Sequence, residues 1–175
     1  MTESLHELGL RFGTDKAGHR YLPRYERHLS YMHYTPMRLL EVGVLGGASL
    51  RMWEAYFERG TITGLDIAPE TIWTSERIQT IVIDVKVFTP PDLLGYDVIV
   101  DDGSHAWPDI IEAHHRLWPH VRPGGWYCIE DLDVQEFSSS KVFDLLFHII
   151  GDLAHEQGDV GELHIYDQIA LIRKR

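Results

Sequence analysis

The chain has 175 residues, of which 44% are hydrophobic and 25% are charged, so it can bury the core of one full domain. The formal net charge of −11 argues against a nucleic-acid partner, because a general binder of the phosphate backbone needs a basic face. No apolar stretch approaches the roughly 20 residues that cross a membrane, and the first residues lack the apolar core of a signal peptide. We therefore expect a cytoplasmic protein without a membrane partner, and its single cysteine, Cys128, excludes an intramolecular disulfide.

The N-terminal segment, residues 1–36, is rich in polar and aromatic groups and precedes the first expected strand. Two interpretations of this segment stay open. As a lid over a bound ligand, it would use Thr14, Lys16, Tyr21 and Tyr25 as contacts. As a surface helix, it would pack its two tyrosines into the core instead.

Apolar runs typical of strands alternate with helical patterns along the rest of the chain. The runs predict strands at residues 38–43, 61–69, 79–85, 96–103 and 124–132. Helical patterns follow at residues 49–60, 107–121 and 140–153, with a candidate helix start in the serines 138–140. Residues 161–175 predict two more strands, joined by a turn at Asp167–Gln168. Together they predict an α/β fold with a doubly wound, mostly parallel, seven-stranded, Rossmann-like sheet that closes with an antiparallel hairpin.

Acidic residues end or follow every expected parallel strand. They are Glu41, Asp66, Asp84, the pair Asp101–Asp102 and the pair Glu130–Asp131. Ligands of such sheets bind beyond the carboxyl ends of the strands. One aspartate at such a place is commonly a turn former, but mutual repulsion makes five acidic strand ends costly unless a ligand or a cation offsets it.

The loop EVGVLGGAS, residues 41–49, connects the first strand to its helix. Gly43 and Gly47 allow a tight turn and a close approach of the backbone to a ligand, and Glu41 and Ser49 flank them as further candidate contacts. The loop lacks the full glycine signature of dinucleotide-binding proteins and the lysine of a phosphate-binding loop, which disfavours nucleotide triphosphates.

Two acids further along predict an adenosine-bearing ligand. Asp66 ends the next strand, where a carboxylate can accept hydrogen bonds from ribose hydroxyls. Asp84 ends the third strand and could accept one from the exocyclic amine of adenine. S-adenosylmethionine (SAM) fits this description, and its positive sulfonium suits an acidic site.

Four stretches now carry a family resemblance: FGTDKAGHRYLPRYERHL, LLEVGVLGGASLRMW, VIVDDGSH and VRPGGWYCIEDL, at residues 12–29, 39–53, 98–105 and 121–132. The chain resembles class I SAM-dependent methyltransferases and, among them, the macrocin- and mycinamicin-type sugar O-methyltransferases. The resemblance implies that residues 1–175 form one methyltransferase domain. Some members carry a further N-terminal domain that helps to build the acceptor site and the oligomer; we expect this chain to lack it, and a homo-oligomer stays open.

The resemblance also implies the chemistry of the site. A divalent cation, usually Mg²⁺, would be held by Asp102, Glu130 and Asp131, whose hard oxygen ligands suit such an ion. Asp101 would then point toward the cofactor. His105 would be the general base that takes the proton of the acceptor hydroxyl. The simpler alternative for His105 is a cap of the helix that begins near residue 107.

The expected function is thus metal-dependent O-methylation of a sugar hydroxyl, on a saccharide or on a glycosylated natural product such as an antibiotic. A catechol or phenol acceptor is the nearest alternative, although the usual base of such enzymes is a lysine and Lys86 is misplaced for that role. A non-catalytic SAM-binding protein, or an iron-dependent relative of the cephalosporin hydroxylases with His105 as a ligand, also stays open.

Overall fold

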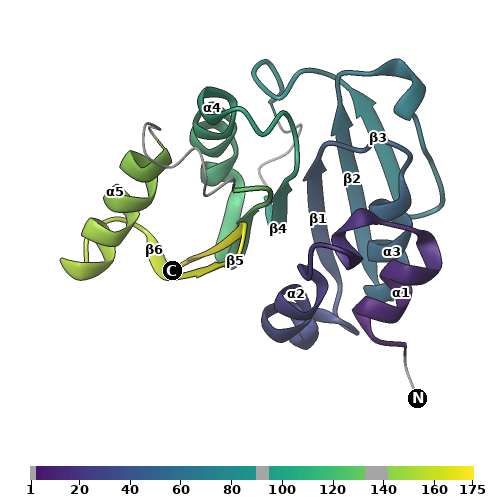
Figure 1. Cartoon of the computed structure of the whole chain (residues 1–175), viewed down its shortest axis with the longest axis horizontal. Helices are drawn as coiled ribbons and strands as arrows, with labels where there is room; N and C mark the ends of the chain where they lie inside the picture. The colour runs from purple at the N-terminus through teal and green to yellow at the C-terminus, as the bar shows by residue number, and fades with distance from the viewer. Residues whose placement is uncertain (1–2, 90–94, 133–141) are drawn as a thin grey trace. The chain divides into compact units, whose positions relative to one another are not determined.

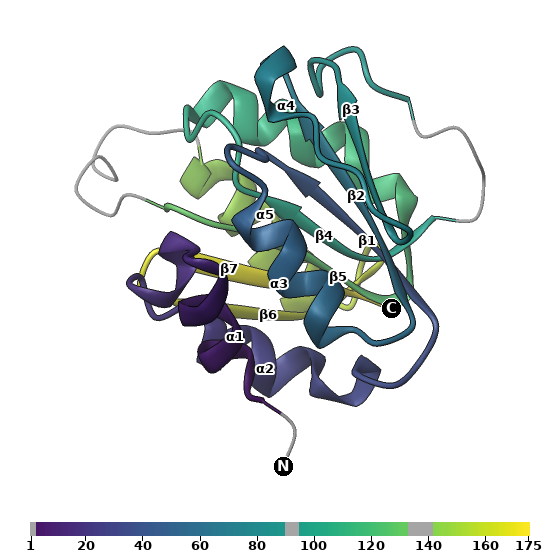
Figure 2. The same cartoon turned by 90° about the vertical axis from the view of Figure 1, so that its right-hand side faces the viewer.

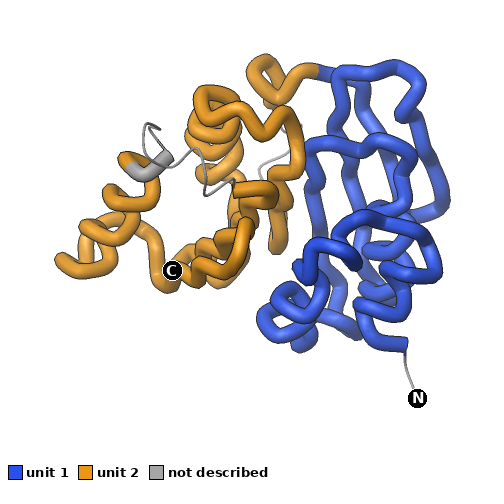
Figure 3. The backbone as a smooth tube through the Cα atoms, viewed as in Figure 1, with its two compact units in different colours: residues 1–83 blue, residues 84–175 orange. Residues whose placement is uncertain are grey.

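The structure, a computed structural model, describes residues 3–89, 95–132 and 142–175. They fall into two compact units, residues 1–83 and residues 84–175 (Figure 3). Each unit has its own strands and its own helices. The candidate helix start in the serines 138–140 lies outside the described residues.

The first unit is built on three parallel strands that lie side by side in Figure 1. The strands are β1 (Met37–Val42), β2 (Gly60–Asp66) and β3 (Ile78–Val82). β2 is the central strand, since it pairs with both of the others. Helix α3 (Ala48–Tyr56) connects β1 to β2 and packs on β2, which is the strand–helix–strand unit expected from the sequence.

The N-terminal segment of this unit is helical. Its helices are α1 (Leu5–Phe12), η1 (Asp15–Ala17), α2 (Leu22–Leu29) and η2 (Ser30–Met32). α1 begins at a capping box, in which Ser4 and Glu7 bind each other's backbone amides, and it ends at Gly13 in the left-handed conformation. The helical part of the expectation for this segment is confirmed, while its action as a lid stays a prediction.

Aromatic packing holds the segment against the rest of the first unit. Tyr21 and Tyr25 are 1% and 0% exposed, so both tyrosines do pack into the core. The ring of Tyr25 meets the ring of Trp53 edge to face, with the centroids 5.1 Å apart. Such aromatic pairs contribute about 0.5–1.5 kcal/mol beyond the area that they bury.

In the second unit, the described residues form further strands and helices. They are β4 (Tyr96–Asp101), α4 (Trp107–Leu117), η4 (Trp118–His120), β5 (Val121–Ile129), α5 (Val142–Ala154), β6 (Val160–Tyr166) and β7 (Ile169–Lys174). β4 and β5 are parallel, whereas β7 is antiparallel to both β5 and β6. Figure 2 shows β6 and β7 as the closing hairpin, and the turn between them contains Gln168 at a φ of 58°. The expected α/β class, with mostly parallel strands and a terminal antiparallel hairpin, is confirmed.

Several boundaries differ from the expected ones. β3 ends at Val82, so Asp84 lies beyond the strand. α4 ends at Leu117 because Pro119 has no amide proton to continue the helical hydrogen bonds. β5 ends at Ile129, which leaves the pair Glu130–Asp131 outside the ladder and available to a loop.

Hydrophobic burial explains the apolar runs of the second unit. Residues 169–172 of β7 are fully buried, and so is Cys128 in β5, as expected for an inert thiol.

Within residues 3–89, 95–132 and 142–175, no helix has the length and apolar character needed to span a bilayer.

Candidate functional site

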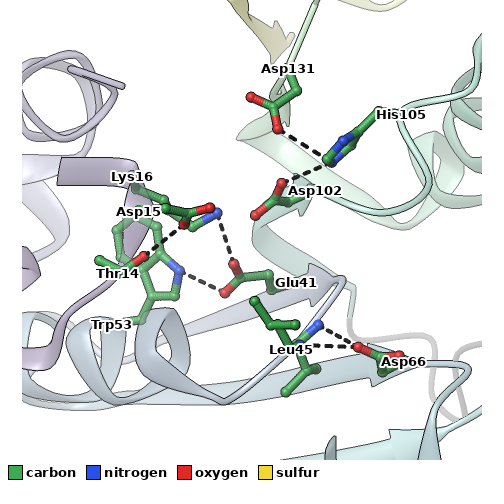
Figure 4. A network of polar contacts seen from close by, with 11 residues as sticks. Thr14, Asp15, Lys16, Glu41, Leu45, Trp53, Asp66, Asp102, His105 and Asp131 are labelled. Atoms are coloured by element: carbon green, nitrogen blue, oxygen red, sulfur yellow. Dashed lines mark hydrogen bonds and ion pairs between the residues drawn. The ribbon is translucent and has the colours of Figure 1, made fainter. Parts of the chain in front are cut away.

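Three side chains of the second unit converge beyond the ends of β4 and β5 (Figure 4). The Nε2 atom of His105 lies 3.2 Å from Oδ1 of Asp102 and 3.4 Å from Oδ2 of Asp131. One ligand atom from each of the three lies within 4.8 Å of the others. The His105 side chain is 44% exposed, and the two carboxylates are 20% and 27% exposed. We call these three residues the acidic cluster.

The register of the parallel strands explains why these residues meet. Asp101 of β4 pairs with Ile129 of β5, and the Glu130 amide donates to the Asp101 carbonyl oxygen at 3.0 Å. Asp102, one residue past Asp101, and Asp131, two residues past Ile129, therefore leave the sheet at the same edge.

Two residues of the acidic cluster have strained backbone conformations. His105 and Asp131 have φ values of 57° and 52°, in the left-handed region that residues other than glycine rarely adopt. Each such residue costs on the order of 1–3 kcal/mol and persists where its surroundings over-determine it, most often at functional sites. The two outliers therefore point to function at this place in the second unit.

The loop that carries His105 is held on its other side by Asp109. Ser104 Oγ donates to Asp109 Oδ2 at 2.7 Å and accepts from the Ala106 amide at 3.3 Å. Lys86 Nζ lies 2.6 Å from Asp109 Oδ1, and this contact holds the pKa of Asp109 below its usual value and the pKa of Lys86 above its own. Sequence reasoning missed this support, although the Ser-x-x-x-x-Asp spacing at a helix start was visible.

The contacts of His105 favour a functional interpretation over helix capping. The N-cap of α4 is Ala106, and no side chain in the described residues caps that helix end. The hydrogen bond to Asp102 raises the pKa of His105, as do the charges of Asp131 and Asp102, while partial burial lowers it. The imidazole thus lies against two carboxylates, where it can accept and hold a proton.

Asp101 and Glu130 are more deeply placed than the acidic cluster. Asp101 is 4% exposed, and burial raises its pKa to about 7, although hydrogen bonds from Tyr127 and Gly103 act in the opposite direction. Glu130 is 2% exposed and is not part of the three-donor group. Its role as a metal ligand stays a prediction, as does the contact of Asp101 with a cofactor.

The glycine loop of the first unit is organised by Asp66 (Figure 4). Oδ2 of Asp66 accepts from the Val44 amide at 2.8 Å and from the Leu45 amide at 3.2 Å, and Oδ1 accepts from the Ala68 amide at 2.9 Å. Burial raises the pKa of Asp66, but these backbone amides outweigh it and lower the pKa overall. Sequence reasoning predicted Asp66 as a ribose contact and missed that it holds the loop; the ribose contact stays a prediction.

Glycine is required at two positions of this loop. Gly43 and Gly47 have φ values of 88° and 70°. A Cβ atom on Gly47 would also meet the Trp73 ring at 3.4 Å. The backbone at Gly47 thus closely approaches the Trp73 ring, and the predicted approach to a ligand stays a prediction.

A buried ion pair lies in the first unit near the start of the loop (Figure 4). Lys16 Nζ is 3.1 Å from Glu41 Oε1, and the indole Nε1 of Trp53 donates to Glu41 Oε2 at 2.9 Å. The Lys16 and Glu41 side chains are 1% and 0% exposed. Two predicted cofactor contacts are therefore engaged with each other.

The remaining predicted cofactor residues belong to both units. Thr14, Tyr21 and Ser49 are buried in the first unit, at 7%, 1% and 7% exposure. Asp84 is exposed at the start of the second unit, where its Oδ1 accepts from the Lys86 amide at 2.8 Å. Their cofactor contacts stay predictions.

Comparison with known proteins identifies the relatives of the chain. No family model matches it. It is 33% identical to mycinamicin VI 2''-O-methyltransferase of Micromonospora griseorubida over 97% of this chain and 52% of that protein. It is 31% identical to 8-demethyl-8-alpha-L-rhamnosyl tetracenomycin-C 2'-O-methyltransferase of Streptomyces olivaceus over 96% of this chain and 54% of that protein. The chain thus spans about half the length of these relatives.

Solved structures show the same relationship. The MycE methyltransferase of the mycinamycin biosynthetic pathway, in complex with Mg, SAH and mycinamycin VI, matches 99% of this chain and 54% of its own, with a TM-score of 0.86 and 33% identity. A putative SAM-dependent methyltransferase of Methanococcus maripaludis, 18% identical with a TM-score of 0.57, shares the fold. The chain is therefore a homologue of the macrocin- and mycinamicin-type sugar O-methyltransferases, with the Rossmann-like fold of class I SAM-dependent methyltransferases.

Proposed function

We propose that this protein transfers the methyl group of SAM to a sugar hydroxyl with the help of a divalent cation, usually Mg²⁺. The observation that carries the proposal is the acidic cluster, in which a histidine and two carboxylates meet at the ends of neighbouring parallel strands. The homologues support it, since they are sugar O-methyltransferases and MycE was solved with Mg and SAH.

The donor set fits a divalent cation. Two ligands of one ion, at bond lengths of 2.0–2.6 Å, can lie at most about 5 Å apart. The donor atoms of the acidic cluster lie within 4.8 Å of one another, which meets this limit. Asp102 and Asp131 would hold the ion, with Glu130 as the third predicted ligand. When bound, the cation would orient the acceptor hydroxyl and lower its pKa.

His105 is the proposed general base. A sugar hydroxyl is a poor nucleophile at neutral pH, so its proton must leave as the new bond to carbon forms. The His105 imidazole accepts that proton, and the carboxylates beside its Nε2 atom stabilise the imidazolium that results. SAM supplies the electrophilic methyl group and leaves as S-adenosylhomocysteine.

The glycine loop is the proposed SAM-binding element. Gly43 and Gly47 present the backbone to the cofactor, and Asp66 holds the loop and contacts the ribose. The other proposed cofactor residues are Thr14, Lys16, Tyr21, Glu41, Ser49, Asp84 and Asp101. Of these, Lys16 and Glu41 would act through the buried ion pair that anchors the start of the loop. We propose that residues 1–175 work as one methyltransferase domain in the cytoplasm.

The proposed acceptor is a sugar of a glycosylated natural product, as in antibiotic biosynthesis, or a saccharide. The named relatives act on such sugars, which supports this class over a catechol or a phenol. Lys86 also speaks against the catechol alternative, because its contact with Asp109 raises its pKa and so keeps the amine protonated, a form that cannot accept a proton. The iron alternative has little support, since the usual facial triad needs two histidines and the acidic cluster contains one.

The test combines calorimetric titration of SAM with a methyl-transfer assay on a panel of sugar and catechol acceptors. We expect chelation to abolish transfer, and His105→Ala to abolish transfer while SAM still binds. His148→Ala is the matched control, because this histidine is 76% exposed on α5. A protein that binds no SAM, or one that keeps full activity after chelation or in His105→Ala, would contradict the proposal.

A further inference from the structure

Tyr127 is a buried residue of β5 that the proposed reaction does not use. Its side chain is 0% exposed, and its hydroxyl donates to Asp101 Oδ2 at 3.1 Å. The His114 ring packs edge to face on the Tyr127 ring, with the centroids 5.0 Å apart. The phenol is therefore held in one place, with its hydroxyl aimed at the carboxylate.

The strand register explains how Tyr127 reaches Asp101. Tyr127 pairs with Ile99 of β4, and Asp101 stands two residues further along the same strand. Side chains two apart on a strand share a face, so the tyrosine and the carboxylate are diagonal neighbours on one face of the sheet. A phenylalanine at this position would fill the same space without reaching the carboxylate.

Asp101 in turn connects both segments that carry the acidic cluster. Its carboxylate is hydrogen-bonded by the Gly103 amide, in the loop that holds Asp102 and His105. Its carbonyl oxygen accepts from the Glu130 amide, next to Asp131. Both His105 and Asp131 are in left-handed conformations, and such strain persists only where other contacts over-determine it. The Asp101 carboxylate constrains the loop of His105, whereas the Asp101 carbonyl oxygen constrains the segment of Asp131.

We propose that Tyr127 is a positioning residue, whose hydrogen bond to the Asp101 carboxylate fixes that side chain and, through it, the loop of Asp102 and His105 in the arrangement that binds the divalent cation. The inference rests on the proposed function, since it assumes that the cluster binds a cation. Groups that orient metal ligands in this way typically change metal affinity by 10–100-fold when they are removed.

The experiment measures Mn²⁺ binding by electron paramagnetic resonance for the wild type and for Tyr127→Phe. We expect the dissociation constant of Mn²⁺ to rise about tenfold in Tyr127→Phe, with an unchanged far-ultraviolet circular dichroism spectrum. Tyr56→Phe is the matched control, because Tyr56 is also a buried tyrosine, 2% exposed, but lies in the first unit. It should bind Mn²⁺ like the wild type.

Asp101→Asn and the double variant Tyr127→Phe/Asp101→Asn complete a double-mutant cycle of Mn²⁺ binding. If the two residues act through their hydrogen bond, the double variant should bind Mn²⁺ no more weakly than the weaker single variant. Losses that multiply, or wild-type affinity in Tyr127→Phe, would overturn the inference. If Tyr127→Phe does not fold, wild-type affinity in Asp101→Asn overturns it equally. A wild-type protein without any Mn²⁺ site would instead overturn the proposed function, and this inference with it.

Discussion

Lys16 and Glu41 form an ion pair that is closed to water, with Nζ and Oε1 3.1 Å apart and both side chains at 1% exposure or less. The pair joins the N-terminal segment to the end of β1, and the indole of Trp53 donates a second hydrogen bond to the same carboxylate. Because taking two charges out of water is costly, each of these residues depends on the other.

Removing one partner of this pair should destabilise the first unit strongly. We expect Lys16→Met to lower the free energy of unfolding by about 3–5 kcal/mol, because it leaves a carboxylate buried without its cation. The double variant Lys16→Met/Glu41→Gln should recover much of that loss, since no buried charge remains and Trp53 keeps an acceptor. Urea denaturation followed by circular dichroism measures both, with Lys86→Met as the exposed lysine control. Equal losses of stability in the single and double variants would show that Lys16 does not stabilise the protein through its ion pair with Glu41.

Asp66 should stabilise the glycine loop in a pH-dependent way. Its pKa is lowered in the folded protein, so its contribution is present above the unfolded pKa and is lost as the pH falls through the folded pKa. We expect Asp66→Asn to be less stable than the wild type at neutral pH and to approach it in acid, because the amide cannot ionise. Urea denaturation at neutral pH and at about pH 3 checks this. A constant difference between the two proteins across this range would contradict it.

The two adjacent glycines of the loop should respond differently to the same substitution. Gly47→Ala must place an alanine at a φ of 70° and its Cβ against the Trp73 ring, so we expect a loss of about 1–2 kcal/mol and weaker SAM binding. Gly46→Ala is the matched control, since no atom lies within 4 Å of its added Cβ. Thermal denaturation and SAM titration of both variants measure the difference. Equal behaviour of the two would mean that the left-handed conformation at residue 47 is not required.

The sequence predicts which strand ends carry the acidic cluster, but it does not predict the contacts that support the cluster. The parallel strands and their acidic ends place Asp102 and Asp131 together, because residues that follow paired positions of neighbouring strands must emerge at one edge. Tyr127 cannot be found in this way, since every second residue of a buried strand has the appearance of simple core. Whether its hydroxyl meets a partner depends on the register of β4 against β5, which no local pattern specifies.

In the N-terminal segment, too, the sequence does not specify which contact a residue makes. The motif in this segment predicts that Lys16 is important. The interpretation of Lys16 as a contact of a bound ligand follows from the polarity of its side chain alone. The structure pairs it with Glu41 in a dry environment, which is a property of tertiary packing. The end of β5 differs from the expected one for a related reason, since residues 130–132 follow the apolar run of the strand without joining its ladder.

His114 should make the protein less stable in mild acid. Its ring is 6% exposed between Trp118 and Tyr127, and neither ring nitrogen has a hydrogen-bond partner within the part of the chain that the structure describes. Burial lowers its pKa to about 4, and the neighbouring His115 contributes to this. The unfolded chain therefore takes up a proton at a higher pH than the folded protein does. Stability is lost as the pH falls from the unfolded value of about 6.5 toward 4, and no further loss occurs below that.

We expect His114→Phe to remove this loss. The phenyl ring keeps the stacking on Trp118 and buries no unpaired nitrogen, so the variant should match or exceed the wild type at neutral pH. At pH 4 its advantage should grow by on the order of 3 kcal/mol, since each unit of pKa shift corresponds to about 1.4 kcal/mol. Urea denaturation between pH 7 and pH 4 measures this, with the exposed His115→Phe as the control. Parallel pH profiles for His114→Phe and the wild type would show that this imidazole is already protonated, or already solvated, in the folded protein.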